Sequence, residues 1–85
     1  MNTVRVESRF DVADGLTPGL AAQIAKCASN YTSHVSIEFD GRAIRIESLI
    51  SILSMELRRG RNLTIVAEGD DAHEAAASLR HLLEE

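Results

Sequence analysis

The stretch VSIEFDGRAIRIE, residues 35–47, alternates apolar and polar side chains on both sides of the pair Asp40-Gly41. Alternation with a period of two is typical of strands that bury one face. Asp-Gly is a preferred two-residue turn between antiparallel strands, because both of its residues tolerate positive φ angles. We therefore predict a β-hairpin over this stretch.

The chain before the hairpin predicts one strand and one helix. Residues 4–10 alternate in the same way, from Val4 to Phe10. Thr17-Pro18 is a typical helix start, because threonine can cap the first turn and proline is tolerated within it. The helix that follows is expected to bury one apolar face, made of Leu20, Ala21, Ile24, Ala28 and Tyr31.

The chain after the hairpin predicts a short helix, a strand and a last helix. The short helix is expected over residues 48–58, with Gly60 as its stop signal. Leu63, Ile65 and Ala67 alternate as a strand does, and the spacing of Asp71 and Glu74 resembles a capping box. The apolar face of the last helix comprises Ala72, Ala75, Ala76, Leu79, Leu82 and Leu83.

The order of these elements is strand, helix, strand, strand, helix, strand, helix. Such helices bury their apolar faces together on one side of a sheet. The sequence predicts an α+β open-faced β-sandwich, with a four-stranded antiparallel sheet and three helices on one face. Residues 1–85 are expected to form a single domain, because chains of this length rarely support two cores.

Net charge, apolar segment length and cysteine count exclude some classes of function. A net charge of -4 argues against nucleic acid, whose phosphates favour basic faces. No segment approaches the roughly 20 apolar residues that span a bilayer, so no membrane association is expected. Cys27 is the only cysteine and suits a reducing compartment, so we expect a cytoplasmic protein with this thiol buried among small apolar residues.

The sequence lacks the motifs of common catalysts. His34, His73 and His81 are scattered in polar surroundings and do not give the spacing of a zinc site. There is no phosphate-binding loop rich in glycine and no serine in a nucleophile elbow. We therefore predict no metal, no cofactor and no enzymatic activity.

Two motifs carry a family resemblance that covers the whole chain. The first is GLTPGLA at residues 15–21, and the second is ESLISILSM at residues 47–55. With the order of the elements, they resemble the active-site loop and the regulatory serine helix of HPr, the histidine-containing phosphocarrier family of the bacterial sugar phosphotransferase system. The family loop usually reads Gly-Leu/Ile-His-Ala-Arg-Pro-Ala, and the family helix begins with Lys-Ser.

The departures from the loop motif bear on function. Thr17 stands where the family has its phosphorylated histidine, Gly19 replaces the arginine and Leu20 replaces the usual proline. An imidazole nitrogen relays a phosphoryl group, whereas a hydroxyl forms a stable ester that is not passed on. The catabolite-repression HPr-like branch, Crh, also lacks the histidine. The resemblance thus implies a regulatory variant without phosphoryl relay, whose partners are proteins of the phosphotransferase or carbon-regulation system, such as HPr kinase or a transcriptional regulator.

Ser48 has two interpretations. As an N-cap it would satisfy a free amide of the short helix, and by resemblance it would be the site of regulatory phosphorylation. Glu47 counts against phosphorylation, because the family often has lysine there and like charges repel. Arg45 would compensate only partly, because a strand alternates its faces.

The short helix has more apolar residues than it can bury. Between residues 49 and 57 they span roughly 220° of the helix circumference, so Leu49, Ile50 and Leu53 are expected to stay exposed. A contiguous apolar surface usually marks a protein contact. In the HPr family, these positions contact enzymes and a transcriptional regulator.

Arg58, Arg59 and Arg61 are expected to lie at the end of the short helix, where cations are favoured. Docking of an acidic partner is the alternative. Two other classes of function also stay open for the whole chain. One is a working phosphocarrier that uses another residue, and the other is an unrelated ferredoxin-like binding module.

Overall fold

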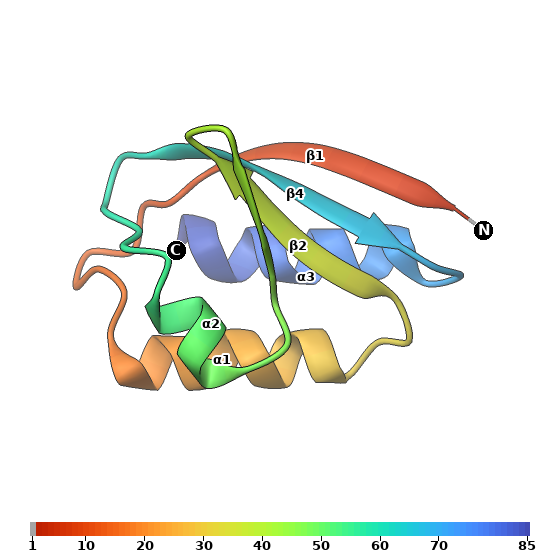
Figure 1. Ribbon diagram of the computed structural model, residues 1–85, viewed down its shortest axis with the longest axis horizontal. Coiled ribbons are helices and arrows are strands. Elements are labelled where there is room, and N and C mark those ends of the chain that lie inside the picture. The colour runs from red at the N-terminus through yellow and green to blue at the C-terminus, as the bar shows by residue number, and fades with distance from the viewer. Residues whose placement is uncertain (1) are drawn as a thin grey trace.

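The computed structural model describes residues 2–85, and the elements follow the predicted order (Figure 1). The strands are β1 (Thr3–Arg9), β2 (His34–Phe39), β3 (Arg42–Arg45) and β4 (Asn62–Glu68). The helices are α1 (Pro18–Ser29), α2 (Leu49–Leu53) and α3 (Ala72–Glu84).

The four strands form one antiparallel sheet in the order β1-β4-β2-β3. Ile65 at the centre of β4 pairs with Val6 on one side and with Ile37 on the other, so apolar side chains align across the sheet. The helices cover one face, and the other face is open (Figure 1). On that open face, Arg5 and Glu38 form an ion pair with 2.5 Å between Nη2 and Oε1. The predicted α+β open-faced sandwich is confirmed.

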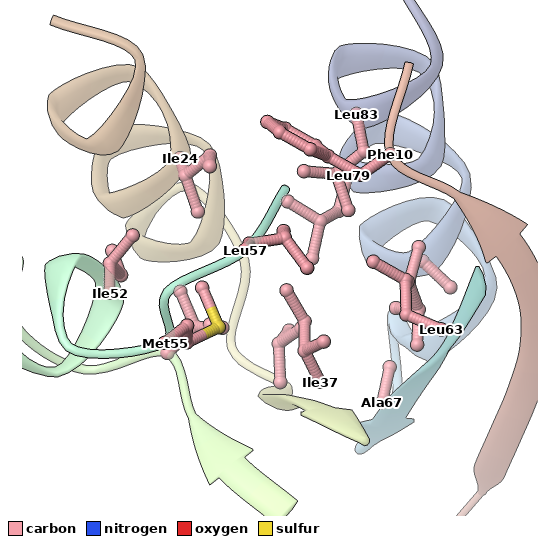
Figure 2. Close-up of a cluster of buried hydrophobic side chains, with 14 of the residues drawn as sticks. Phe10, Ile24, Ile37, Ile52, Met55, Leu57, Leu63, Ala67, Leu79 and Leu83 are labelled. Carbon is pink, nitrogen blue, oxygen red and sulfur yellow. The ribbon is translucent and has the colours of Figure 1, made fainter. Parts of the chain in front are cut away.

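The core lies between the sheet and the helices (Figure 2). Ile37 and Ile65 point into it from the sheet, while Ile24 enters from α1 and Leu79 from α3. Each of these four side chains is 0–1 % exposed. The predicted alternation of the strands and the predicted apolar faces of the two long helices therefore account for most of the core.

The predicted length of the short helix is wrong. It was expected over residues 48–58, but α2 ends at Leu53. Glu56 then adopts a left-handed backbone conformation with φ of +53°. In a continued helix, Leu57 would lie about 140° around the axis from the buried Ile52 and would face away from the core. The turn at Glu56 instead lets both Met55 and Leu57 enter the core, where they are 1 % and 4 % exposed.

The expected capping box at the start of α3 is also wrong. Asp71 is the N-cap residue, but its side chain bonds no amide of α3. Its carboxylate instead accepts hydrogen bonds from the backbone amides of Thr32 and Ser33, each at 2.9 Å, and from the Ser33 hydroxyl. These bonds, that of the Ser33 hydroxyl first, lower the pKa of Asp71 below its usual value. The residue thus ties the start of α3 to the segment that precedes β2.

Candidate functional site

The start of α1 uses the Thr17 side chain as a cap. Thr17 has an extended backbone, and its Oγ1 accepts a hydrogen bond from the amide of Leu20 at 3.1 Å. Its carbonyl oxygen accepts from the amide of Ala21 at 2.9 Å. Pro18 is the first helical residue, as predicted. The Thr17 side chain therefore stabilises the start of α1.

The same bonds leave little of an anion site in the first turn. Helix starts bind anions through free backbone amides, but those of Leu20 and Ala21 are engaged and Pro18 has none. Within residues 2–85, the amide of Gly19 is the one in this turn that donates to no protein acceptor. Leu20 is only 9 % exposed and belongs to the core.

Ser48 caps α2 and remains exposed. Its Oγ accepts a hydrogen bond from the amide of Ser51 at 3.2 Å and lies 3.0 Å from the Ser51 hydroxyl. The capping interpretation of Ser48 is confirmed, and phosphorylation stays a prediction. The contact with the Ser51 hydroxyl was not anticipated, although the spacing of three residues between the two serines could have indicated it.

The charge next to Ser48 is partly balanced. Arg45 and Glu47 form an ion pair, with 3.1 Å between Nε of the arginine and Oε1 of the glutamate. The two residues are two positions apart, at the end of β3 and just beyond it. The glutamate beside Ser48 therefore has a cationic partner, and we expect it to repel a phosphate less than an unpaired carboxylate would.

Three apolar side chains of α2 face solvent, as expected. Leu49, Ile50 and Leu53 are 43 %, 81 % and 39 % exposed, and we call them the α2 surface. Ile52 anchors the opposite side of the helix and is fully buried. Because α2 packs against α1 (Figure 1), the α2 surface and the start of α1 lie on the helical side of the sheet.

None of the three histidines belongs to this site. His34 begins β2, at the end of the molecule opposite the start of α1 (Figure 1). His73 and His81 line a groove between α3 and β1, on the edge of the sheet away from α1 and α2. All three side chains are exposed. The expected surface position of these histidines is thus confirmed.

Cys27 lies in α1 and is half-buried, so it is less enclosed than expected. Burial raises the pKa of its thiol, which disfavours the reactive thiolate. Over residues 2–85 there is no cluster of three or more histidine, cysteine or carboxylate side chains placed to hold a metal ion. Every helix in the described part of the chain is too short or too polar to cross a bilayer.

Comparison with known families decides the evolutionary relationship. Residues 4–85 match the family described as "PTS HPr component phosphorylation site". The chain belongs to the HPr family. This membership excludes the unrelated ferredoxin-like module, one of the alternatives left open by the sequence.

Individual relatives come from both branches of the family. The chain is 36% identical over 81 residues to "Phosphocarrier protein HPr" of Borreliella burgdorferi, covering 95% of this chain and 94% of the relative. It is 31% identical over 81 residues to "HPr-like protein Crh" of Halalkalibacterium halodurans, covering 93% and 96%. The crystal structure of a phosphocarrier protein HPr from Bacillus anthracis superposes with a TM-score of 0.89 at 28% identity, covering 95% of this chain and 96% of that one. The chain is thus an HPr-like protein of the phosphotransferase system or of carbon regulation.

Proposed function

We propose that this chain, acting as one domain in the cytoplasm, is a regulatory HPr-family protein that binds partner proteins and does not relay phosphoryl groups. One observation carries the proposal: Thr17 stands at the relay position, and its hydroxyl caps α1. The partners would be proteins of the phosphotransferase or carbon-regulation system, such as HPr kinase or a transcriptional regulator.

The chemistry of the first turn supports the loss of relay. A relay needs a nucleophile that accepts the phosphoryl group from one protein and releases it to another. A phosphate ester on Thr17 would be stable to transfer. Gly19 supplies no side-chain donor to a phosphoryl group on Thr17.

Incubation with phosphoenolpyruvate and enzyme I tests this proposal. We expect no acid-labile phosphate on the purified chain, with a histidine-containing HPr as the positive control. The double variant Thr17→His, Gly19→Arg should gain acceptance, because it restores the nucleophile and the arginine on the same scaffold. Acid-labile phosphate on wild type, whether at His34, His73 or His81, would contradict the proposal.

The regulatory half of the proposal concerns Ser48. Its hydroxyl is exposed and stands beside the α2 surface, so a phosphate there would change the charge of a protein-binding face. We expect incorporation of one phosphate from ATP by HPr kinase. The incorporation should vanish in Ser48→Ala and persist in Ser51→Ala, which is the matched control from the same helix. Equal labelling of the two variants would refute Ser48 as the acceptor.

The α2 surface is the proposed contact for these partners. Leu53→Asp and Ile50→Asp should each weaken binding to purified HPr kinase, because a charge in an apolar contact loses its hydration without a partner. Ala77→Asp adds the same charge at an exposed position of α3 and serves as the control. Equal weakening by the control variant would show that net charge, and not this surface, governs binding.

A further inference from the structure

The arginines of residues 58–61 require a new explanation. They were expected at the end of the short helix, but α2 ends at Leu53, so no helix terminus accounts for them. The segment is a turn in which the amide of Arg61 donates to the carbonyl of Arg58 at 3.2 Å. Gly60 occupies the left-handed region with φ of +91°, which glycine adopts without strain.

The core holds the backbone of this turn in place. The amide of Gly60 donates to the carbonyl of Phe10 at 2.6 Å, and the amide of Phe10 donates to the carbonyl of Arg61 at 2.9 Å. The side chain of Phe10 is fully buried in the core (Figure 2). Arginine side chains that start from so fixed a backbone lose less freedom on binding than those on a mobile loop.

Two further arginines come from other elements. Arg42, at the start of β3, and Arg61 both place their guanidinium groups over the ring of Phe39, at 5.7 and 5.8 Å from its centroid. Arg9, at the end of β1, places Nη2 3.5 Å from where a Cβ of Gly60 would stand. We call the resulting set the arginine cluster: Arg9, Arg42, Arg58, Arg59 and Arg61.

The arginine cluster has a local excess of positive charge. It holds five of the nine basic residues of a chain whose net charge is -4. Arg61 pairs with Asp40 at 2.5 Å, and Arg9 pairs with Asp11 at 3.0 Å. The five arginines and these two aspartates leave three positive charges. In the described part of the chain, neither Arg58 nor Arg59 has a carboxylate within 4.0 Å, and both are exposed.

Arg58, Arg59 and Arg61 border a shallow depression in the surface. Its volume is about 540 Å³, and it is lined by Asp40 and by residues 58–62. A site this open does not enclose a small metabolite, which usually has most of its surface buried. The surface instead suits a segment of another macromolecule.

We propose that the arginine cluster binds an acidic segment of a partner protein. Guanidinium groups bind carboxylates through paired hydrogen bonds. Two arginines of the cluster already form ion pairs with carboxylates of this chain, Arg61 with Asp40 and Arg9 with Asp11. Nucleic acid fits less well. The ring of Phe39, beneath the guanidinium groups of Arg42 and Arg61, is only 7 % exposed, so it offers no face for a base to stack on. The surface is separate from the α2 surface and extends the proposed function to a second contact.

The test uses fluorescence anisotropy with the whole chain and a labelled decapeptide of alternating aspartate and glutamate. We expect saturable binding that weakens steeply with salt. The double variant Arg58→Gln, Arg59→Gln should weaken it about tenfold, the effect of losing two exposed ion pairs. The matched control, Arg5→Gln with Arg80→Gln, removes the same charge elsewhere and should leave affinity within about twofold.

Four results would overturn the proposal: equal weakening in both double variants, equal binding of an asparagine-glutamine decapeptide, displacement of the acidic peptide by millimolar inorganic phosphate, or tighter binding of an oligothymidylate that depends on Arg58 and Arg59. The third would indicate a small-anion site, and the fourth a nucleic-acid surface. The enzyme I and HPr kinase tests change none of these arginines. A negative result with the acidic peptide would therefore leave the proposed regulatory function standing.

Discussion

Replacing Thr17 by valine tests directly whether this side chain, at the proposed site of the lost relay, serves the fold. The variant keeps the size and branching of the side chain and removes only Oγ1, which accepts from the Leu20 amide at 3.1 Å. Because Thr17 is exposed, the new methyl group creates neither a cavity nor a clash. Loss of such a cap costs about 1 kcal/mol. For a domain of this size, that corresponds to a fall in melting temperature of roughly 4–8 °C.

The assay combines thermal unfolding with hydrogen exchange of single amides. Thr17→Ser is the matched control, because it keeps the hydroxyl and should unfold within about 0.5 kcal/mol of wild type. In Thr17→Val, the Leu20 amide should exchange faster, since its acceptor is gone. Unchanged melting together with unchanged exchange at Leu20 would refute the capping role, and with it the structural explanation for threonine at this position.

Three further outcomes are expected. Gly69→Ala should lower the free energy of unfolding, measured with urea, by about 3 kcal/mol. The reason is that Gly69 has φ of +147° and an added Cβ would stand 2.8 Å from Ser33 Cα. A loss below about 0.5 kcal/mol would contradict this packing. Asp71→Asn should lower the melting temperature at pH 7. The difference from wild type should shrink as the pH falls below the ordinary pKa of Asp71 and the carboxylate is protonated, because the folded state holds that pKa down. A difference that stays constant as the pH falls through this range would contradict the carboxylate's role. Ile50→Asp should leave stability unchanged, since this side chain is 81 % exposed. Met55→Ala should lower the free energy of unfolding by about 2–5 kcal/mol in chemical denaturation, because Met55 is buried. The opposite ranking would contradict the burial of these two side chains.

The sheet could be predicted because its signals are local and repeated. The alternation of residues 35–47 around Asp40-Gly41 sets both the hairpin and the buried side of each strand. The start of α1 could be predicted for the same reason, since Thr17 and Pro18 act within one helical turn. A strand or a helix start of this kind depends on residues only a few positions apart.

The end of α2 and the role of Asp71 could not be predicted, because distant parts of the fold determine both. The apolar residues up to Leu57 fit a helix when they are counted along the chain. The core, however, buries Leu57 only if the chain turns at Glu56. Asp71 has the spacing of a capping residue. Its carboxylate oxygens, however, accept hydrogen bonds from the amides of Ser33 and Thr32, which are 38 and 39 residues away in the sequence. In both places, tertiary contacts prevail over a plausible local pattern.

The proposed loss of relay and the proposed retention of docking are physically compatible because they depend on different elements. Thr17 acts only within the first turn of α1, where its Oγ1 and its carbonyl oxygen accept hydrogen bonds from the amides of Leu20 and Ala21. The α2 surface is positioned by Ile52, which is anchored in the core and has no hydrogen bond to that turn. Restoring the family proline at Leu20 would also remove a buried side chain and the amide that bonds Thr17. The first turn of α1 is thus part of the packing of the domain, while α2 presents exposed apolar side chains.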